Sequence, residues 1–211
     1  MCGRFQLEFS IEDMDRYYNL IGVLEDSMDQ SVSARLSPSA LEEVRGVKYP
    51  SNPSLIIKAN SLDILPWGFP FNNKLIINAR GETLFEKRIY STAALTQRCL
   101  IPANCFFEWK DKVKFNIAPQ KGSLFSMAGI YKSFLNEDGS LLERYVIITT
   151  SANEEMSKIH HRMPVIIPED KEKTYLNPKT SQEEIFDLLI PYSKAISITT
   201  KEPPMQQLSL F

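Results

Sequence analysis

The sequence predicts a single α+β domain with a curled, largely antiparallel β-sheet or barrel that is flanked by helices. Short β-like runs occupy much of the chain, and the helical segments between them do not follow the strand–helix alternation of a parallel sheet. A chain of 211 residues, 43% of them apolar, can form one domain with a sizeable core. We expect this domain to span residues 1–202, followed by a C-terminal tail at 203–211.

The first half of the chain combines one clear helix signal with a long stretch of weak pattern. Ser10, with Asp13 three residues later, predicts a helix start before the apolar positions up to residue 21. Residues 25–54 contain three prolines and little periodicity, so they predict a long loop region with short extended pieces. Strands are predicted at Ser54–Lys58 and Leu75–Asn78, and a helix at Thr83–Thr96.

The second half is predicted to consist mainly of strands. Arg98–Pro102 leads into the first of them, Cys105–Lys110, and the others are expected at Val113–Ile117, Ser126–Tyr131, Arg144–Thr149, Met163–Ile167 and Ala195–Thr199. Helices are expected at Ser151–His160 and Ser181–Leu189.

Composition narrows the class of protein. A net charge of −2 does not favour a protein that coats nucleic acid nonspecifically, so any DNA contact must come from a local basic patch. Three irregularly spaced cysteines argue against a disulfide framework and for a reducing compartment, and Cys99 and Cys105 have the apolar neighbours of core residues. No apolar run is long enough to span a membrane, and the N-terminus lacks the pattern of a signal peptide. We therefore expect a cytoplasmic protein without a membrane partner.

Cys2 is the most informative residue of the chain. A small second residue permits removal of Met1, which would leave a free α-amine beside a thiol. The amine titrates near roughly 8 and the thiol near about 8.5, so both have reactive fractions close to neutral pH. With an aldehyde, this pair can form a Schiff base and close it into a five-membered thiazolidine. The alternative is that Cys2 is only a small apolar residue.

Two further segments carry groups suited to proton transfer. Glu108 lies in an aromatic strand, Cys-Phe-Phe-Glu-Trp-Lys, where loss of hydration would favour its protonated form. An exposed glutamate on an edge strand is the alternative. His160 and His161 are adjacent, which makes a poor zinc site, so we expect no metal. One of them is better suited to acid–base work, unless both lie at the surface.

Polar and aromatic residues between the first strands are candidates for binding. Asn78 ends an apolar run and offers both a donor and an acceptor, while Arg80 can bind a phosphate oxygen. A turn asparagine and a solvated arginine would be the ordinary interpretation of the same residues. Trp67 lies in a Pro-Trp-Gly loop, where its ring could stack on a base or cap the core.

Several motifs follow one another in order along the chain. They are Cys-Gly-Arg-Phe at 2–5, Trp-Gly at 67–68, Asn-Ala-Arg-Gly-Glu-Thr at 78–83, Arg-Cys-Leu-Ile-Pro at 98–102, Phe-Phe-Glu-Trp-Lys at 106–110, Ala-Gly-Ile-Tyr at 128–131, Ile-Thr-Thr-Ser-Ala-Asn at 148–153 and Ile-His-His-Arg-Met-Pro at 159–164. In combination they resemble the SRAP family, the SOS response-associated peptidases, over most of the predicted domain. The chain departs from the family pattern before Trp67, where the Arg-Tyr-Asn-x-Ala-Pro segment of many members has no clear match.

The resemblance implies a sensor that captures abasic sites in single-stranded DNA covalently and needs no cofactor. It implies that Cys2 is the nucleophile and that Asn78 holds its amine. Glu108 would then shuttle protons, and His160 would act on the sugar oxygen during ring opening and reversal. The expected DNA-binding residues are Gly3, Arg4, Trp67, Arg80 and Arg162.

The C-terminal tail carries a separate signal. Its last residues, Gln207, Leu208, Ser209, Leu210 and Phe211, resemble the peptide that docks on the bacterial sliding clamp. Apolar anchors on a tail with no helix to join suit peptide-in-groove recognition. We expect the clamp as a partner, unless the tail packs on its own domain.

Further functions remain open from the residues alone. Glutamine amidotransferases also expose an N-terminal cysteine followed by glycine and use the α-amine as a base, but the polar Arg4-Phe5-Gln6 run is unlike their apolar start. The residues are also compatible with a thiol peptidase, or with a noncatalytic DNA-binding module in which Cys2 is incidental. Ammonia release from glutamine would identify an amidotransferase.

Overall fold

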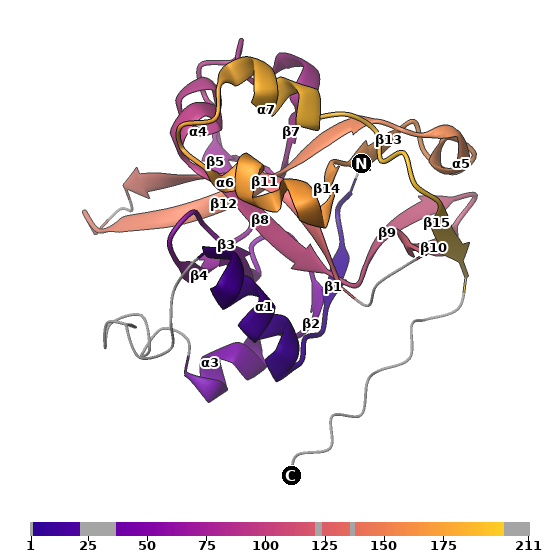
Figure 1. The fold of residues 1–211 in the computed structure, drawn as a ribbon, viewed down its shortest axis with the longest axis horizontal. Helices are drawn as coiled ribbons and strands as arrows, with labels where there is room; N and C mark the ends of the chain where they lie inside the picture. The colour runs from indigo at the N-terminus through magenta and orange to yellow at the C-terminus, as the bar shows by residue number, and fades with distance from the viewer. Residues whose placement is uncertain (1, 22–36, 121–123, 136–137, 201–211) are drawn as a thin grey trace.

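The computed structural model describes residues 2–21, 37–120, 124–135 and 138–200, and its described strands form two main sheets (Figure 1). Nearly all of the strand pairs are antiparallel. The α+β class and the antiparallel, curled sheet are thus confirmed, whereas a closed barrel is not formed. None of the helices in the described part of the chain has both the length and the apolar character to cross a membrane.

One five-stranded sheet places the start of the chain beside the aromatic strand. Its order is β15 (Ile196–Thr199), β10 (Val113–Pro119), β9 (Cys105–Lys110), β1 (Phe5–Leu7) and β2 (Gly46–Lys48). Phe5 pairs with Phe106, and Gln6 with Cys105. Because β1 and β9 are antiparallel, the residues before Phe5 run towards the C-terminal end of β9.

The second sheet is built on the long hairpin of β11 (Phe125–Leu135) and β12 (Leu141–Ser151). Its order is β13 (Arg162–Pro164), β12, β11, β8 (Arg98–Ala103), β3 (Pro53–Ile57) and β4 (Leu62–Pro66), with β14 (Ile166–Ile167) on β11 and β7 (Asn78–Arg80) on β12. β7 is parallel to β12, with Asn78 opposite Ile147, while β13 pairs with the last residues of β12. β12 therefore separates the segment that carries Asn78 from the segment that follows His160.

Short helices and a small hairpin complete the fold. They are α1 (Ile11–Ile21), α3 (Pro38–Glu43), the hairpin of β5 (Phe69–Phe71) and β6 (Lys74–Ile76), the 3-10 helix η2 (Gly81–Thr83), α4 (Ser91–Thr96), α5 (Glu154–Ser157), the 3-10 helix η3 (Glu169–Lys171), α6 (Glu172–Leu176) and α7 (Gln182–Leu188). The predicted start of α1 is confirmed, because the Ser10 N–H donates to Asp13 Oδ2 at 2.8 Å and the Asp13 N–H donates to Ser10 Oγ at 3.2 Å.

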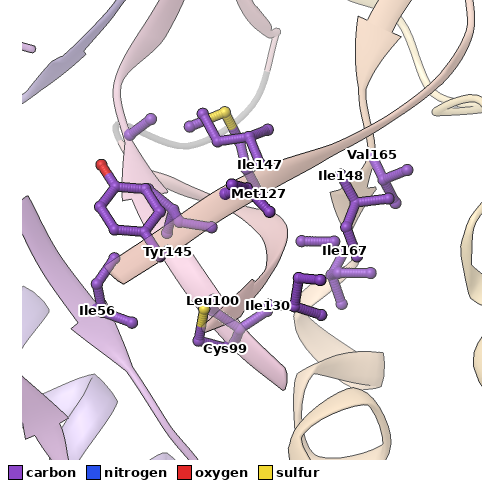
Figure 2. Packing of buried hydrophobic residues seen from close by; sticks show 14 of the residues in the cluster. Ile56, Cys99, Leu100, Met127, Ile130, Tyr145, Ile147, Ile148, Val165 and Ile167 are labelled. Carbon is purple, nitrogen blue, oxygen red and sulfur yellow. The ribbon is translucent and has the colours of Figure 1, made fainter. Parts of the chain in front are cut away.

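The apolar core lies between the large sheet and the elements packed on it. Figure 2 shows side chains from β3, β8, β11 and β12, among them Ile56, Leu100, Met127 and Tyr145, gathered in one cluster. All four of these side chains are fully buried. Burial of this kind is the main stabilising contribution to folding, because it removes apolar surface from water.

Arg98 ties two helices to this core. Its guanidinium donates to Ala94 O at 2.9 Å and Leu95 O at 2.5 Å in α4, and to Tyr175 O at 2.6 Å and Asn177 O at 2.5 Å at the end of α6. These carbonyls lie at helix C-termini, where no intrahelical donor remains and a positive charge is favourable. Arg98 is 3% exposed, so the charge is buried and held by these carbonyls.

Several predicted elements differ from the observed ones. Residues 83–96 were expected to be helical throughout, but only η2 and α4 form at the ends of this segment, joined by turns such as Lys87 N–H to Thr83 O at 3.2 Å. The region at 25–54 includes α3 and β2 in its described part, while β4, β5 and α6 were not predicted. These elements are short, so their periodicity is too weak to identify them and packing decides their form.

Candidate active site

Cys2 lies just before β1, along the C-terminal half of β9. Its side chain is fully buried, and its thiol contacts Arg4 O at 3.8 Å. The Phe107 N–H donates to Arg4 O at 2.9 Å, which continues the β1–β9 pairing past Phe5. Asn78 Nδ2 donates to Cys2 O at 2.9 Å. Cys2 therefore lies between the two sheets, with its carbonyl bound to Asn78 of β7 and its thiol in contact with the residue that continues β1.

The surroundings of Cys2 keep its thiol protonated. Burial is the main cause that raises the pKa of this thiol, and the negative charge of Glu108 raises it further. A neutral thiol is a weak nucleophile until a base removes its proton. The same coupling shows that Glu108 is near enough to Cys2 for its charge to act on the thiol.

Asn78 combines a fixed donor with a buried acceptor. Its side-chain Nδ2 is bound to Cys2 O, whereas its Oδ1 is buried and accepts no hydrogen bond from the described residues. A buried amide oxygen without a donor is unfavourable, and native proteins normally satisfy such atoms. Asn78 Oδ1 can therefore accept a hydrogen bond from a group that arrives at the site, such as an amine.

Glu108 is part of β9 and is buried, with 5% of its surface exposed. It therefore differs from the exposed edge-strand glutamate that was the alternative from the sequence. Its register partner in β10 is Phe115, and the following residue, Trp109, lies on the opposite face of the strand. The alternation within β9 thus sends the acid towards the interior and the tryptophan towards solvent.

His160 follows α5 and is half-buried. The Arg162 N–H donates to His160 Nδ1 at 3.0 Å, and the imidazole stacks on that of His161 with ring centroids 4.4 Å apart. The same Nδ1 also lies 3.1 Å from Arg162 O, so both backbone polar groups of Arg162 contact this ring nitrogen and hold the orientation of the imidazole. Lys110 Nζ donates to Lys158 O at 2.7 Å, which joins the end of β9 to the segment that carries His160.

The arginines that were expected to bind phosphate have different surroundings. Arg80 is exposed at the end of β7. The Arg4 guanidinium lies between two rings, 4.4 Å from the centroid of Tyr49 and 4.7 Å from that of Trp109. Arg162 is 9% exposed and is paired with Glu82, so this pair would have to open before Arg162 could contact a phosphate. Phosphate binding by these residues stays a prediction, as does DNA contact by Gly3.

Trp67 belongs to the core. It is fully buried, its Nε1 donates to Ile77 O at 2.8 Å, and its ring packs on Phe5 and Tyr145. A ring without exposed surface cannot stack on a base, so direct base stacking by Trp67 is not supported and the core interpretation fits the structure. Gly68 is required beside it, because its φ is +113° and a Cβ there would lie 2.5 Å from a side-chain carbon of Leu75.

Three residues that the sequence did not single out also belong to this region. Trp109 and Tyr49 are 40% and 44% exposed and flank Arg4, and Glu82 binds Arg162. Strand alternation places Trp109 opposite the buried Glu108, which is a signal for an exposed aromatic ring. Nothing local in the sequence indicates Tyr49 or Glu82, because their partners come from distant segments.

The C-terminal pentapeptide at 207–211 lies outside the described residues, so clamp binding stays a prediction. Among the residues that the structure does describe, no cluster of three or more His, Cys, Asp or Glu side chains could hold a metal ion.

Comparison with known proteins gives one consistent result. The family model described as "SOS response associated peptidase (SRAP)" matches residues 1–202. The chain is 34% identical to the abasic site processing protein YoqW of Bacillus subtilis over 201 residues, which covers 91% of this chain and 88% of YoqW. It is 24% identical to the abasic site processing protein YedK of Escherichia coli, with 89% and 85% of the two chains covered.

Solved structures agree with these sequence relatives. A crystal structure of a protein from Bacteroides thetaiotaomicron is similar with a TM-score of 0.75 and 26% identity, and the match covers 93% of this chain and 90% of that one. The fold, the order of the motifs and the family model all lead to the same assignment. This chain belongs to the SRAP family.

Proposed function

We propose that this protein processes abasic sites in single-stranded DNA by capturing them covalently through Cys2. One observation carries the proposal: the second residue is held between two sheets, bound to Asn78 and coupled electrostatically to the buried Glu108. A cysteine that served only as apolar filling would need neither partner. The similarity to proteins named abasic site processing proteins supports the same substrate.

The proposed reaction joins the ring-opened sugar of the abasic site to both nucleophiles of Cys2. After removal of Met1, the α-amine adds to the C1′ aldehyde, and the resulting carbinolamine loses one water to give an iminium ion. The thiol sulfur then adds to C1′ as the thiol loses its proton, which leaves the nitrogen neutral and closes a thiazolidine. The net change is one C–N bond, one C–S bond and one water released.

Each neighbour of Cys2 has a role in this sequence. Asn78 Oδ1 accepts a hydrogen bond from the α-amine and orients it towards the aldehyde. Glu108, once protonated, gives its proton to the hydroxyl group of the carbinolamine, which leaves as water, and the carboxylate then takes the proton of the thiol, which burial keeps in its neutral form. His160, whose Nδ1 is held by the backbone of Arg162, donates a proton to the sugar oxygen during ring opening and supports reversal of the adduct.

The outer face of the five-stranded sheet is the surface that we assign to the DNA strand. Arg4 lies between the exposed rings of Tyr49 and Trp109, and Lys112 and Lys114 lie in the adjacent hairpin. Aromatic rings stack on bases of any sequence, and cations bind phosphates, which together suit an unpaired strand. This patch supplies the local positive charge that the overall net charge of −2 does not.

We expect Trp109→Ala to weaken binding of intact single-stranded DNA. Loss of one stacked base costs about 1–3 kcal/mol, so the dissociation constant should rise roughly 5- to 150-fold. The measurement is fluorescence anisotropy with an oligonucleotide that lacks abasic sites, which isolates noncovalent binding. Phe186→Ala, at an aromatic residue of α7 that is 50% exposed, is the matched control. Equal affinities for the two variants would remove Trp109 from the interface.

Intact-protein mass spectrometry tests the proposed function as a whole. The purified protein should lack Met1, and after incubation with an abasic oligonucleotide its mass should increase by that of the oligonucleotide minus one water. Peptide mapping should place the adduct on Cys2. A chain with a tag ahead of Cys2 should keep its fold and form no adduct, because its amine is blocked. An adduct on any other residue, or on the tagged chain, would contradict the proposal.

A further inference from the structure

We propose that Glu82 is a positioning residue for His160, which it controls through Arg162. The inference rests on the proposed function for its catalytic consequence, but the positioning itself is a property of the free protein. Glu82 belongs to η2, directly after the strand that carries Asn78, and Arg162 begins β13, directly after the two histidines.

The ion pair bridges the two sides of the site. Arg162 Nη1 donates to Glu82 Oε1 at 2.5 Å and Nη2 donates to Oε2 at 2.9 Å, a bidentate pair. The same Nη2 also donates to Thr149 O at 2.7 Å. Thr149 belongs to β12, which β7 and β13 flank on opposite sides. The guanidinium therefore crosses β12 and fixes the Asn78 segment relative to the His160 segment.

The backbone of Arg162 passes this constraint to the imidazole. Its N–H lies 3.0 Å and its carbonyl oxygen 3.1 Å from His160 Nδ1, so the position of residue 162 sets which of these two groups the imidazole pairs with and thereby its tautomer. The turn is short, with only His161 between the two residues. His161 itself is exposed, and the Ala152 N–H donates to its carbonyl at 3.1 Å. The side chain of Arg162 is thus the most extensively bound group in this turn.

Glu82 has the charge that this role requires. The hydrogen bonds from Arg162 lower the pKa of the Glu82 carboxyl, so it remains a carboxylate at neutral pH. Its side chain is 47% exposed whereas that of Arg162 is 10% exposed. Without Glu82, the buried guanidinium keeps only Thr149 and can turn towards other acceptors. The turn that presents His160 would then lose its side-chain anchor and be held only by backbone contacts to β12 and Ala152.

The test uses the fact that the chain has only two histidines. In a His161→Gln background the remaining imidazole signals belong to His160, so 15N NMR reports its tautomer in the free protein directly. We expect one dominant tautomer with Glu82 present, a mixture of tautomers in Glu82→Ala, and an intermediate result in Glu82→Gln, which retains one acceptor. Glu86→Ala, at a nearby exposed glutamate, should leave the tautomer unchanged.

Adduct reversal provides the second measurement. Because His160 would be misplaced in Glu82→Ala, we expect the rate of adduct reversal to fall about tenfold in this variant. This loss is a part of the rate enhancement that a general acid or base usually contributes. Affinity for intact single-stranded DNA should not change. An unchanged His160 tautomer in both Glu82 variants would overturn the inference. Tighter DNA binding together with an unchanged reversal rate would also overturn it, because the role of Glu82 would then be only to keep Arg162 from binding phosphates. If the wild-type protein forms no adduct, the proposed function fails, and the tautomer measurement still decides the role of Glu82.

Discussion

Cys2→Ala should form no heat-stable complex with single-stranded DNA that contains an abasic site. The variant keeps the α-amine, because alanine also permits removal of Met1, but it has no sulfur to close the ring. The imine that remains hydrolyses on denaturation, so we expect a loss of at least about 10³-fold in stable complex on denaturing gels. Reduction with borohydride before denaturation should restore the complex, since it converts the imine into a stable amine.

The controls separate this chemistry from folding. Cys105→Ala removes another buried thiol and should leave complex formation intact, because Cys105 has no amine beside it. Thermal unfolding of both alanine variants should show modest and similar losses of stability, as expected for truncating a small buried side chain. A stable complex in Cys2→Ala without reductant would identify another residue as the nucleophile and reject the assignment.

Glu108→Gln should slow complex formation at neutral pH by about 10²- to 10⁴-fold, the usual contribution of a general acid or base. Glutamine keeps the volume and some hydrogen bonding of the buried side chain, so noncovalent binding should persist. Because the charge of Glu108 raises the pKa of the Cys2 thiol, the substitution should also lower that pKa. The thiolate then becomes accessible at lower pH, and we expect the defect to shrink as the pH rises.

The rate of complex formation, followed by quenching at intervals from pH 6 to pH 9, checks both parts of this prediction. Asp111→Asn is the matched control, because it removes a negative charge in the same hairpin, at an exposed turn position. A rate for Glu108→Gln within a factor of two of the control would exclude proton transfer by Glu108. A defect that stayed constant with pH would exclude its effect on the thiol.

The local sequence pattern predicted those helices and strands whose own residues carry a strong secondary-structure signal. The aromatic strand was predicted with the observed bounds, Cys105–Lys110, and the Ser10–Asp13 start preceded a helix as expected. The sequence pattern did not predict where the strands of the long β11–β12 hairpin begin and end. β12 extends over Leu141–Ser151, beyond the predicted core of Arg144–Thr149, because pairing with β11 continues into residues that alternate poorly. Register is a property of two strands, so one strand alone does not define its length.

In the candidate site, too, some features could be predicted from the sequence and others could not. The alternation along β9 and the position of Cys2 were readable from the sequence, and the side chains of Glu108 and Cys2 are both buried. The burial of Trp67 was not readable, because a tryptophan in a loop can cap a core or face solvent. The pairing of Arg162 with Glu82 was not readable either. These two residues are 80 apart in the chain, and only the arrangement of β7 and β13 around β12 brings them together.

The sequence by itself determined which residue we propose as the reactive group, because the chemistry of an N-terminal cysteine depends on two atoms attached to adjacent carbons of one residue. It also determined the family, through motifs in a fixed order. Only the tertiary structure decided which arginine is exposed, which tryptophan can meet a base and which side chain fixes the imidazole. Burial and partner choice depend on contacts between segments that are distant in the chain, and such contacts exist only once the sheets have formed.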